Sequence, residues 1–150
     1  MSSSQANEVV AAARRWLGTP YVHQCSARGQ GTDCLGLLRG VWRDVIGREP
    51  AEIPSYTADW SECSSLERLW HAAREHLKEV PVDPNCPGCV VLFRMQRSSV
   101  AKHLAILATG PAGMPTIIHA YSGKGVVETP LTLPWRRRIV SQFQYPKGGN

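Results

Sequence analysis

Cys34 follows a glycine-bearing loop and opens a stretch with the apolar spacing of a helix. The first turn of a helix presents backbone N–H groups that lack a partner within the helix, and it carries a partial positive charge. Both features favour a thiolate, and such positions can lower the pKa of a cysteine from about 8.5 to roughly 3.5–7.5. Cys34 is therefore a candidate nucleophile. The alternative interpretation is a small buried apolar residue.

A cysteine nucleophile needs a base, and the base needs a group that orients it. His103 and His119 fall on consecutive predicted strands, with a Gly-Pro-Ala-Gly turn between them. A hairpin that places the two histidines directly opposite each other has its turn centred on Pro111, inside that sequence. Facing Cβ atoms lie about 5 Å apart, so the rings would touch and His119 would fix the tautomer of His103. Two unrelated strand histidines are the alternative.

The other histidines are weaker candidates for a catalytic site. His71 and His76 fall on a predicted helix, where roles at the surface or at the edge of the core are expected. His23 lies in the loop before Cys34 and is a candidate for lining the site.

A Cys-Pro-Gly-Cys sequence at 86–89 has the spacing of a redox motif or of half a zinc site. A zinc site needs a second ligand pair, and none occurs at a suitable spacing. A thioredoxin-like motif stands between a strand and a helix, whereas this one follows a proline-rich loop and precedes an apolar strand. A turn that leads into a strand is the better interpretation, so we expect neither a metal nor a cofactor.

The elements that must position these residues change in type along the chain. Apolar residues recur at helical spacing in the first half and in short runs between turn residues in the second. Helices are predicted over 9–17, from 34 to 47 and from about 66 to 77, the last after a Ser64-x-x-Glu67 capping box. Strands are predicted over 89–93, 103–108, 116–121, 126–127 and 139–143, with a loop at 21–32 and an extended surface segment at 49–60. Helices followed by an antiparallel sheet indicate an α+β fold.

Length and composition are those of one globular domain. The chain has 150 residues, 43% hydrophobic and 19% charged, and we expect a single domain over 1–150 with its core at about 8–145. No apolar run is long enough for a membrane span. The N-terminus lacks a basic segment followed by an apolar one, so no cleaved secretory signal is expected. The five cysteines are odd in number, which favours at least one free thiol over a disulfide framework.

The net charge of +5 is concentrated toward the C-terminus, at Arg136, Arg137, Arg138 and Lys147. A solvated basic face is the plain interpretation, and attraction to an anionic surface such as a cell wall is the second. Nucleic-acid binding is not expected, because no basic stripe interleaved with aromatic residues is present.

Five sequence blocks, taken in order, resemble the NlpC-type cell-wall endopeptidases, which are papain-like cysteine peptidases. The blocks are Gly18-Thr19-Pro20-Tyr21, Asp33-Cys34-Leu35-Gly36-Leu37, the Pro87-Gly88 turn before an apolar strand, His103 opening a strand, and His119 on the next. The resemblance covers about residues 8–130. Over 23–60 the chain is most similar to small peptidases encoded among phage-tail genes and in gene-transfer-agent clusters.

The resemblance implies a papain-like fold, with helices packed on a C-terminal antiparallel sheet, and a role for each matching residue. Cys34 is the implied nucleophile, His103 the base and acid, and His119 the orienting residue. Tyr21 is implied to assist the oxyanion site, and Asp33 to contact the free amine of the substrate peptide. The expected substrate is the peptide stem of peptidoglycan, cut at the γ-D-glutamyl bond to a diamino acid.

Leu35 stands where the family usually has serine, a partner of Asp33 in amine binding, and Cys89 replaces a usual aspartate. The resemblance further implies delivery by a phage tail or gene-transfer-agent particle to the cell wall or periplasm, with tail, baseplate or hub proteins as partners. One alternative is a tail or baseplate component that keeps the fold without activity. Another is an acyltransferase or amidase on the same fold.

Overall fold

The computed structural model describes residues 1–50, 68–96 and 101–148. The Ser64–Glu67 capping box and most of the predicted surface segment at 49–60 lie outside these ranges. The elements follow one another as predicted in type, with helices first and strands afterwards. The fold is therefore α+β, as expected.

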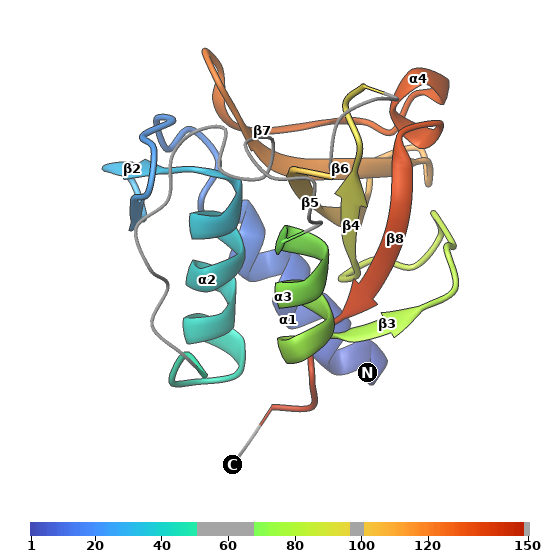
Figure 1. Cartoon of the computed structure of the whole chain (residues 1–150), viewed down its shortest axis with the longest axis horizontal. Helices are drawn as coiled ribbons and strands as arrows, with labels where there is room; N and C mark the ends of the chain where they lie inside the picture. Colours follow the sequence, from blue (N-terminus) through green and yellow to red (C-terminus); the bar gives the residue numbers. More distant parts are fainter. Residues whose placement is uncertain (51–67, 97–100, 149–150) are drawn as a thin grey trace.

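Two long helices form the N-terminal part of the chain (Figure 1). Helix α1 spans Ser3–Arg14 and α2 spans Cys34–Val45. The first begins earlier than the apolar pattern predicts, because the Ser2 hydroxyl accepts a hydrogen bond from the Gln5 N–H at 3.1 Å. Helix α3 spans Arg68–His76.

Six antiparallel strands form the main sheet, in the order β3-β8-β4-β5-β6-β7. Their bounds are β3 Lys78–Val80, β4 Val90–Phe93, β5 His103–Thr109, β6 Pro115–Tyr121, β7 Gly125–Pro130 and β8 Ile139–Gln144. The last strand pairs between β3 and β4, so the chain returns to the middle of the sheet before it ends. Strand β3 was not predicted, since Lys78-Glu79-Val80 is short and carries no apolar run.

Two further differences from the predictions concern short elements. The predicted loop at 21–32 contains a small hairpin of two-residue strands, β1 at Ser26–Ala27 and β2 at Gly31–Thr32. A short helix, α4 at Leu133–Arg136, forms between the last two predicted strands, where no element was predicted, because proline is accommodated in the first turn of a helix.

Apolar side chains cover both faces of the sheet. One face packs against α1, α2 and α3 through residues such as Leu92, Leu104 and Ile106. The other face carries Val91, Phe93, Ala105 and Leu107. Because side chains alternate along a strand, the odd-numbered residues of β5, including His103, point away from the helices.

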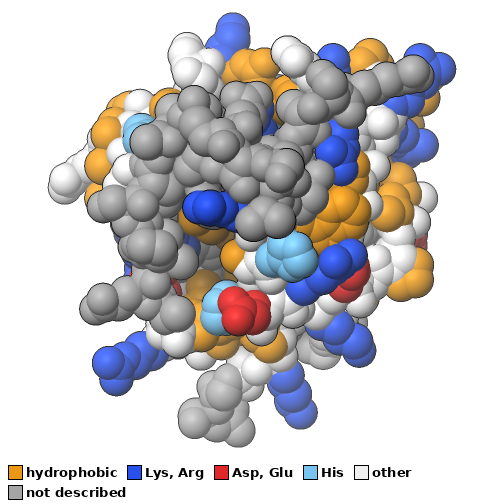
Figure 2. All heavy atoms as spheres, in the orientation of Figure 1, with side chains coloured by type: hydrophobic (Ala, Val, Ile, Leu, Met, Phe, Trp, Pro, Cys, Tyr) orange, Lys and Arg blue, Asp and Glu red, His pale blue; other side chains and the backbone are white. Residues whose placement is uncertain are grey.

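No helix within the described ranges is long and apolar enough to cross a membrane. Lys and Arg side chains occur at several separate places on the face shown in Figure 2. This spread fits a solvated basic surface better than a single binding patch on that face.

Candidate active site

Cys34 is the first residue of α2, as the sequence predicts, and Asp33 caps the helix. One carboxylate oxygen of Asp33 accepts the Gly36 N–H at 2.7 Å, and the other accepts the Gln24 N–H at 2.8 Å. The Asp33 residue is only 3% exposed. The carboxylate therefore joins the loop to the first turn of α2, directly beside the thiol.

The loop before Cys34 packs closely on α2, and this contact depends on Gly36. A Cβ atom added to Gly36 would lie 2.0 Å from the Cys25 carbonyl oxygen and 2.5 Å from the Thr32 hydroxyl. Gln24 adopts a φ of 65°, a left-handed conformation that is costly for a residue with a side chain. The Asp33 carboxylate holds this conformation by accepting the Gln24 N–H.

The Cys34 sulfur lies against the first residues of β5. Its distance to the Lys102 carbonyl oxygen is 3.9 Å, and the Leu104 backbone N–H also faces it. The Leu107 N–H donates to the Cys89 carbonyl oxygen, which lies on the β4 side of β5. Backbone groups of successive strand residues point to opposite sides, so the odd-numbered residues of β5 direct theirs toward β4 and the even-numbered ones toward β6. The sulfur thus occupies the β6 side of β5.

Strands β5 and β6 separate where the sulfur lies. Their paired residues end at Ile106 and Ile118, whereas the β6–β7 pairing continues to Tyr121 and Gly125. The start of β5 is therefore paired with β4, through Phe93 and His103, and is open toward Cys34 on its other side.

His103 and His119 contact each other through their rings, as the sequence predicts. The Nε2 atom of His103 lies 2.7 Å from Nδ1 of His119, and the ring centroids are 5.0 Å apart. The predicted register is wrong, however. The observed pairs, Ile106 with Ile118 and Thr109 with Pro115, place the two histidines diagonally rather than directly opposite. A shift of two residues keeps them on one face because side chains alternate with a period of two.

A second contact, with a hydroxyl on β7, bears on which ring nitrogens of the two histidines carry protons. Nε2 of His119 lies 3.5 Å from the Thr129 hydroxyl on β7. If His119 donates from Nε2 to Thr129, its Nδ1 must accept from Nε2–H of His103. His103 then keeps a lone pair on Nδ1, the state that a general base requires.

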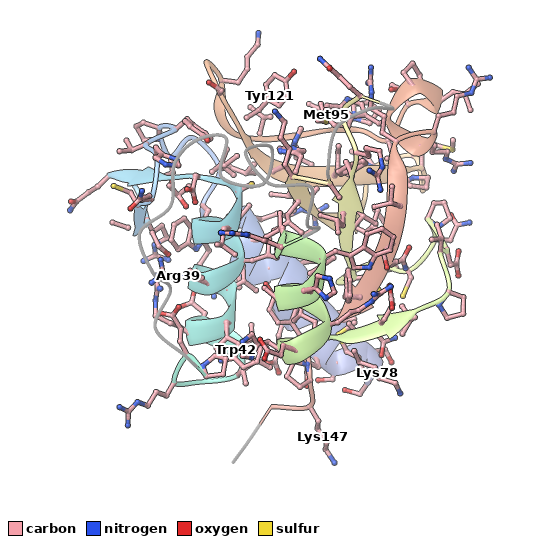
Figure 3. The ribbon with its side chains drawn as sticks, viewed as in Figure 1. Arg39, Trp42, Lys78, Met95, Tyr121 and Lys147 are labelled. Carbon is pink, nitrogen blue, oxygen red and sulfur yellow. The ribbon has the colours of Figure 1, made fainter. Side chains whose placement is uncertain are left out.

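Aromatic rings enclose the two histidines on the face of the sheet that α4 covers. The Trp135 ring centroid lies 5.7 Å from that of His103 and 5.2 Å from that of His119. Phe93 and Tyr121 also contact His103, at 5.8 Å and 5.9 Å between centroids. Figure 3 shows Tyr121 at the same end of the molecule as Met95 and at the opposite end from Trp42.

Thr129 and Trp135 were missed in the sequence analysis. The β6–β7 register pairs His119 with Val127 and so places Thr129 diagonally from it, on the same face. A register estimate for this hairpin would have pointed to Thr129. No local signal marks Trp135, since it belongs to a helix that was not predicted.

Burial dominates the protonation of the candidate nucleophile and base. It raises the pKa of the Cys34 thiol to about 12, and the Asp33 carboxylate adds to that increase. Burial lowers the pKa of His103 to about 3, helped by the charges of His119 and Lys102. Without substrate the two groups are therefore a neutral thiol and a neutral imidazole. This differs from the thiolate that the helix start suggests.

The remaining predicted site residues lie around the first turn of α2. Burial raises the pKa of Tyr21 to about 12, and the neighbouring Cys34 and Asp33 contribute to the shift. Nδ1 of His23 lies 3.7 Å from an Asp33 oxygen. Tyr21, His23 and Asp33 thus form the side of the site that is supplied by the loop.

Metal ligands are not grouped in the part of the chain that the structure describes, where no three histidine, cysteine or acidic side chains are placed to hold an ion. The arrangement instead supplies a thiol, an imidazole that a second imidazole orients, and backbone N–H groups at a helix start. These are the parts that nucleophilic catalysis by a thiol requires.

An α+β fold that carries a cysteine at a helix start and two hydrogen-bonded strand histidines is typical of a class of thiol-dependent hydrolases. Residues 18–143 match the family model described as the NlpC/P60 family, so the chain belongs to the NlpC/P60 family. Members of this family are generally cysteine peptidases.

One similar solved structure is a protein of Staphylococcus aureus described as similar to lipoprotein, NLP/P60 family. It superposes with a TM-score of 0.59 at 16% sequence identity, a likeness that concerns the fold alone. The match covers 100% of this chain and 43% of the Staphylococcus aureus chain. No curated protein matches the sequence.

Proposed function

We propose that this chain is a cysteine endopeptidase that hydrolyses the peptide stems of peptidoglycan, with Cys34 as nucleophile and His103 as base. The observation that carries the proposal is the 2.7 Å contact between His103 and His119, together with the contact between the Cys34 sulfur and Lys102, the residue before His103. Membership of the NlpC/P60 family supplies the class of substrate.

The proposed reaction begins with proton transfer from the Cys34 thiol to Nδ1 of His103, as the sulfur attacks the carbonyl carbon of the scissile bond. The developing oxyanion is held by the Cys34 backbone N–H and the Tyr21 hydroxyl. His103 then gives the proton to the leaving amine, and an acyl-enzyme remains. Water, deprotonated by His103, attacks the thioester, and the proton returns to the sulfur as the acid leaves.

His119 acts in this scheme by accepting a hydrogen bond from Nε2–H of His103. That bond stabilises the imidazolium which forms during attack, when the protonated ring is otherwise disfavoured by burial. Thr129 keeps His119 in the accepting tautomer. We therefore assign His119 and Thr129 as positioning residues.

The bond we propose is the γ-D-glutamyl bond to a diamino acid. Asp33, with His23 beside it, is the proposed contact for an amine of the substrate. Both Asp33 oxygens already accept backbone N–H groups, so any such contact would be an additional one. Leu35, which is partly buried, cannot supply the hydroxyl that a serine would offer.

Delivery by a phage tail or gene-transfer-agent particle, with action in the cell wall or periplasm, is proposed from the sequence resemblance alone. An inactive tail or baseplate component is the second candidate function. The oriented imidazole argues for the enzyme, because a purely structural role does not require a hydrogen-bonded histidine pair together with a free thiol at a helix start.

The test is digestion of purified peptidoglycans of several wall chemistries, followed by mass spectrometry of the muropeptides. We expect fragments with a new free amine on the diamino acid, and complete loss of these fragments with Cys34→Ala. Cys25→Ser is the matched control, since it changes another cysteine of the same region. Intact stems in every peptidoglycan, from a chain that is folded, would support the inactive component instead.

A further inference from the structure

The Cys86-Pro87-Gly88-Cys89 segment is the one chemical motif that the proposed peptidase site does not use. The Cys86 and Cys89 side chains are both free thiols, and their sulfur atoms lie 2.7 Å apart. Cys86 is partly exposed, whereas Cys89 is fully buried. One accessible thiol therefore lies in contact with one protected thiol.

The backbone between the two cysteines forms the turn that the sequence predicts. The Cys89 N–H donates to the Cys86 carbonyl oxygen at 3.2 Å, and Gly88 has a φ of 87°. Proline second and a left-handed glycine third are the pattern of a type II turn. Such a turn keeps its end Cα atoms within about 7 Å, close to the range of about 4.4–6.8 Å that a disulfide spans.

Neighbouring elements hold this turn in place. A Cβ atom on Gly88 would lie 2.9 Å from the Ala6 Cα atom in α1, so the turn packs directly on that helix. The Gly88 N–H donates to the Leu107 carbonyl oxygen at 2.8 Å, and the Leu107 N–H donates to the Cys89 carbonyl oxygen at 2.8 Å. The two sulfurs are therefore kept together by the fold and not by chance contact of flexible side chains.

This thiol pair is separate from the peptidase site. Cys89 pairs with Leu107 on β5, and Leu107 lies four residues from His103 on the same strand. At ~3.3 Å per residue, Leu107 and His103 are about 13 Å apart. None of the contacts that hold the turn includes a residue of the Cys34 site.

We propose that Cys86 and Cys89 form a redox-active dithiol that closes to an intramolecular disulfide when it meets a small disulfide or a disulfide-bonded oxidoreductase. Cys86, the accessible thiol, gives up its proton and attacks one sulfur of the oxidant, which releases one thiol and leaves a mixed disulfide. Cys89 then loses its proton and attacks the Cys86 sulfur, and the second thiol leaves. Two electrons and two protons pass to the oxidant, whose disulfide becomes two thiols.

The test uses the full chain carrying Cys34→Ala, so that the proposed nucleophile cannot react. The protein is incubated with oxidised glutathione, treated with iodoacetamide and digested with trypsin without reduction. Residues 79–94 form one tryptic peptide that contains Cys86 and Cys89 and no other cysteine. We expect this peptide to lack alkylation and to be about 2 Da lighter than the dithiol, and dithiothreitol to restore two alkylation sites.

Two further variants test the order of attack. With Cys89→Ser the reaction should stop at a glutathione adduct on Cys86, and with Cys86→Ser the buried Cys89 should stay unmodified for the same time. Cys25→Ser is the control and should leave closure unchanged. A glutathione adduct that persists on Cys86 while Cys89 is present, or a bond from either residue to Cys25 or Cys63, would overturn the proposal.

Discussion

In the proposed mechanism, the proton that passes from Cys34 to His103 decides how the site reacts. The Leu35 and Leu104 backbone N–H groups favour the thiolate, but burial and the Asp33 carboxylate outweigh them. Burial also disfavours the protonated form of the His103 imidazole, which receives the proton in the proposed mechanism. In the proposed mechanism, proton transfer to His103 therefore accompanies nucleophilic attack by the sulfur.

This protonation state leads to a pH-dependent rate of alkylation at Cys34. At pH values below a pKa of about 12, the thiolate fraction of Cys34 increases roughly tenfold for each unit by which the pH rises. We expect the second-order rate constant for iodoacetamide at Cys34 to rise in that way from pH 6 to 9, measured by mass spectrometry of the peptide that contains it. A rate that is already constant from pH 6 upward would show a preformed thiolate and contradict the assignment.

Thr129 is expected to control the tautomer of the two histidines. Thr129→Val keeps the shape of the side chain and removes the hydroxyl that lies 3.5 Å from Nε2 of His119. The loss of one hydrogen bond is worth roughly 0.5–1.5 kcal/mol, which predicts a fall in kcat of up to about tenfold with KM unchanged.

Nitrogen NMR of the imidazoles gives a second measurement that does not need a substrate. The unmodified chain should show His103 protonated at Nε2, and Thr129→Val should populate the other tautomer. Thr116→Val is the control, because that hydroxyl bonds to Glu128 on the same hairpin and not to a histidine. Unchanged tautomers in Thr129→Val would remove Thr129 from the positioning role.

At the scale of elements, the thiol is positioned by the close approach of α2 to its neighbours. Gly36 allows the loop to pack on the first turn, and Gly40 allows Trp16, which follows α1, to pack one turn later. The Arg43 guanidinium and the Ser26 side chain complete the attachment, since Arg43 donates to Ser26 and Ser26 donates to the Gly36 carbonyl. The helix apolar pattern predicted α2, but a pattern of apolar residues does not reveal which glycines are contact points.

Gly40→Ala is expected to destabilise the protein despite the higher helix propensity of alanine. Its Cβ atom would lie 2.0 Å from Cζ2 of Trp16, which is buried in the core. Overpacking of this kind costs about 1–3 kcal/mol, against a gain of about 1 kcal/mol from helix propensity.

Urea denaturation measures the effect, and Asp44→Ala on the exposed side of α2 is the control. We expect a lower midpoint for Gly40→Ala and a change within about 0.5 kcal/mol for the control. An equal or higher midpoint for Gly40→Ala would mean that α1 moves away from α2 without cost.

At the scale of the whole molecule, α1 is tied to the far edge of the sheet by an ion pair. The Arg14 guanidinium donates to both carboxylate oxygens of Glu128, at 3.0 Å and 2.9 Å, and to the Thr109 carbonyl. Thr116 also donates to Glu128, and the pKa of that carboxyl is lowered, first by Arg14. The stabilisation is present above the ordinary carboxyl pKa and is lost as pH falls below it.

His103 and His119 give the stability a separate pH dependence at higher pH. Burial lowers the pKa of His103 to about 3 and that of His119 to about 4, whereas an unfolded histidine titrates near about 6.5. The unfolded chain therefore binds more protons between these values, and the free energy of unfolding must fall as pH decreases through that window. At pH 5 each histidine lowers the free energy of unfolding by about 2 kcal/mol relative to neutral pH.

Urea denaturation at pH 7.5, 6 and 5 measures this loss. His119→Gln should roughly halve the decrease between pH 7.5 and 5, whatever it does to the stability at pH 7.5. His71→Gln, at an exposed position of α3, is the control and should leave the decrease unchanged. The same decrease in all three proteins would show that the histidine pair does not carry it.

The sequence by itself determined the α+β order of elements, the helix that begins at Cys34 and the presence of His103 and His119 on neighbouring strands. These follow from local rules, since apolar period, capping residues and turn residues act within a few positions of each other. The Pro87-Gly88 turn was predicted for the same reason.

Only the tertiary structure decided the register of the β5–β6 hairpin, the place of β8 in the middle of the sheet and the enclosure of the histidines by Trp135. It also decided that Cys34 is a neutral thiol, because burial depends on what the rest of the chain packs around the sulfur. A helix start supplies the same local field in any protein. Burial of the sulfur and the Asp33 carboxylate outweigh that field, and no spacing in the sequence measures how closely the chain packs around the sulfur.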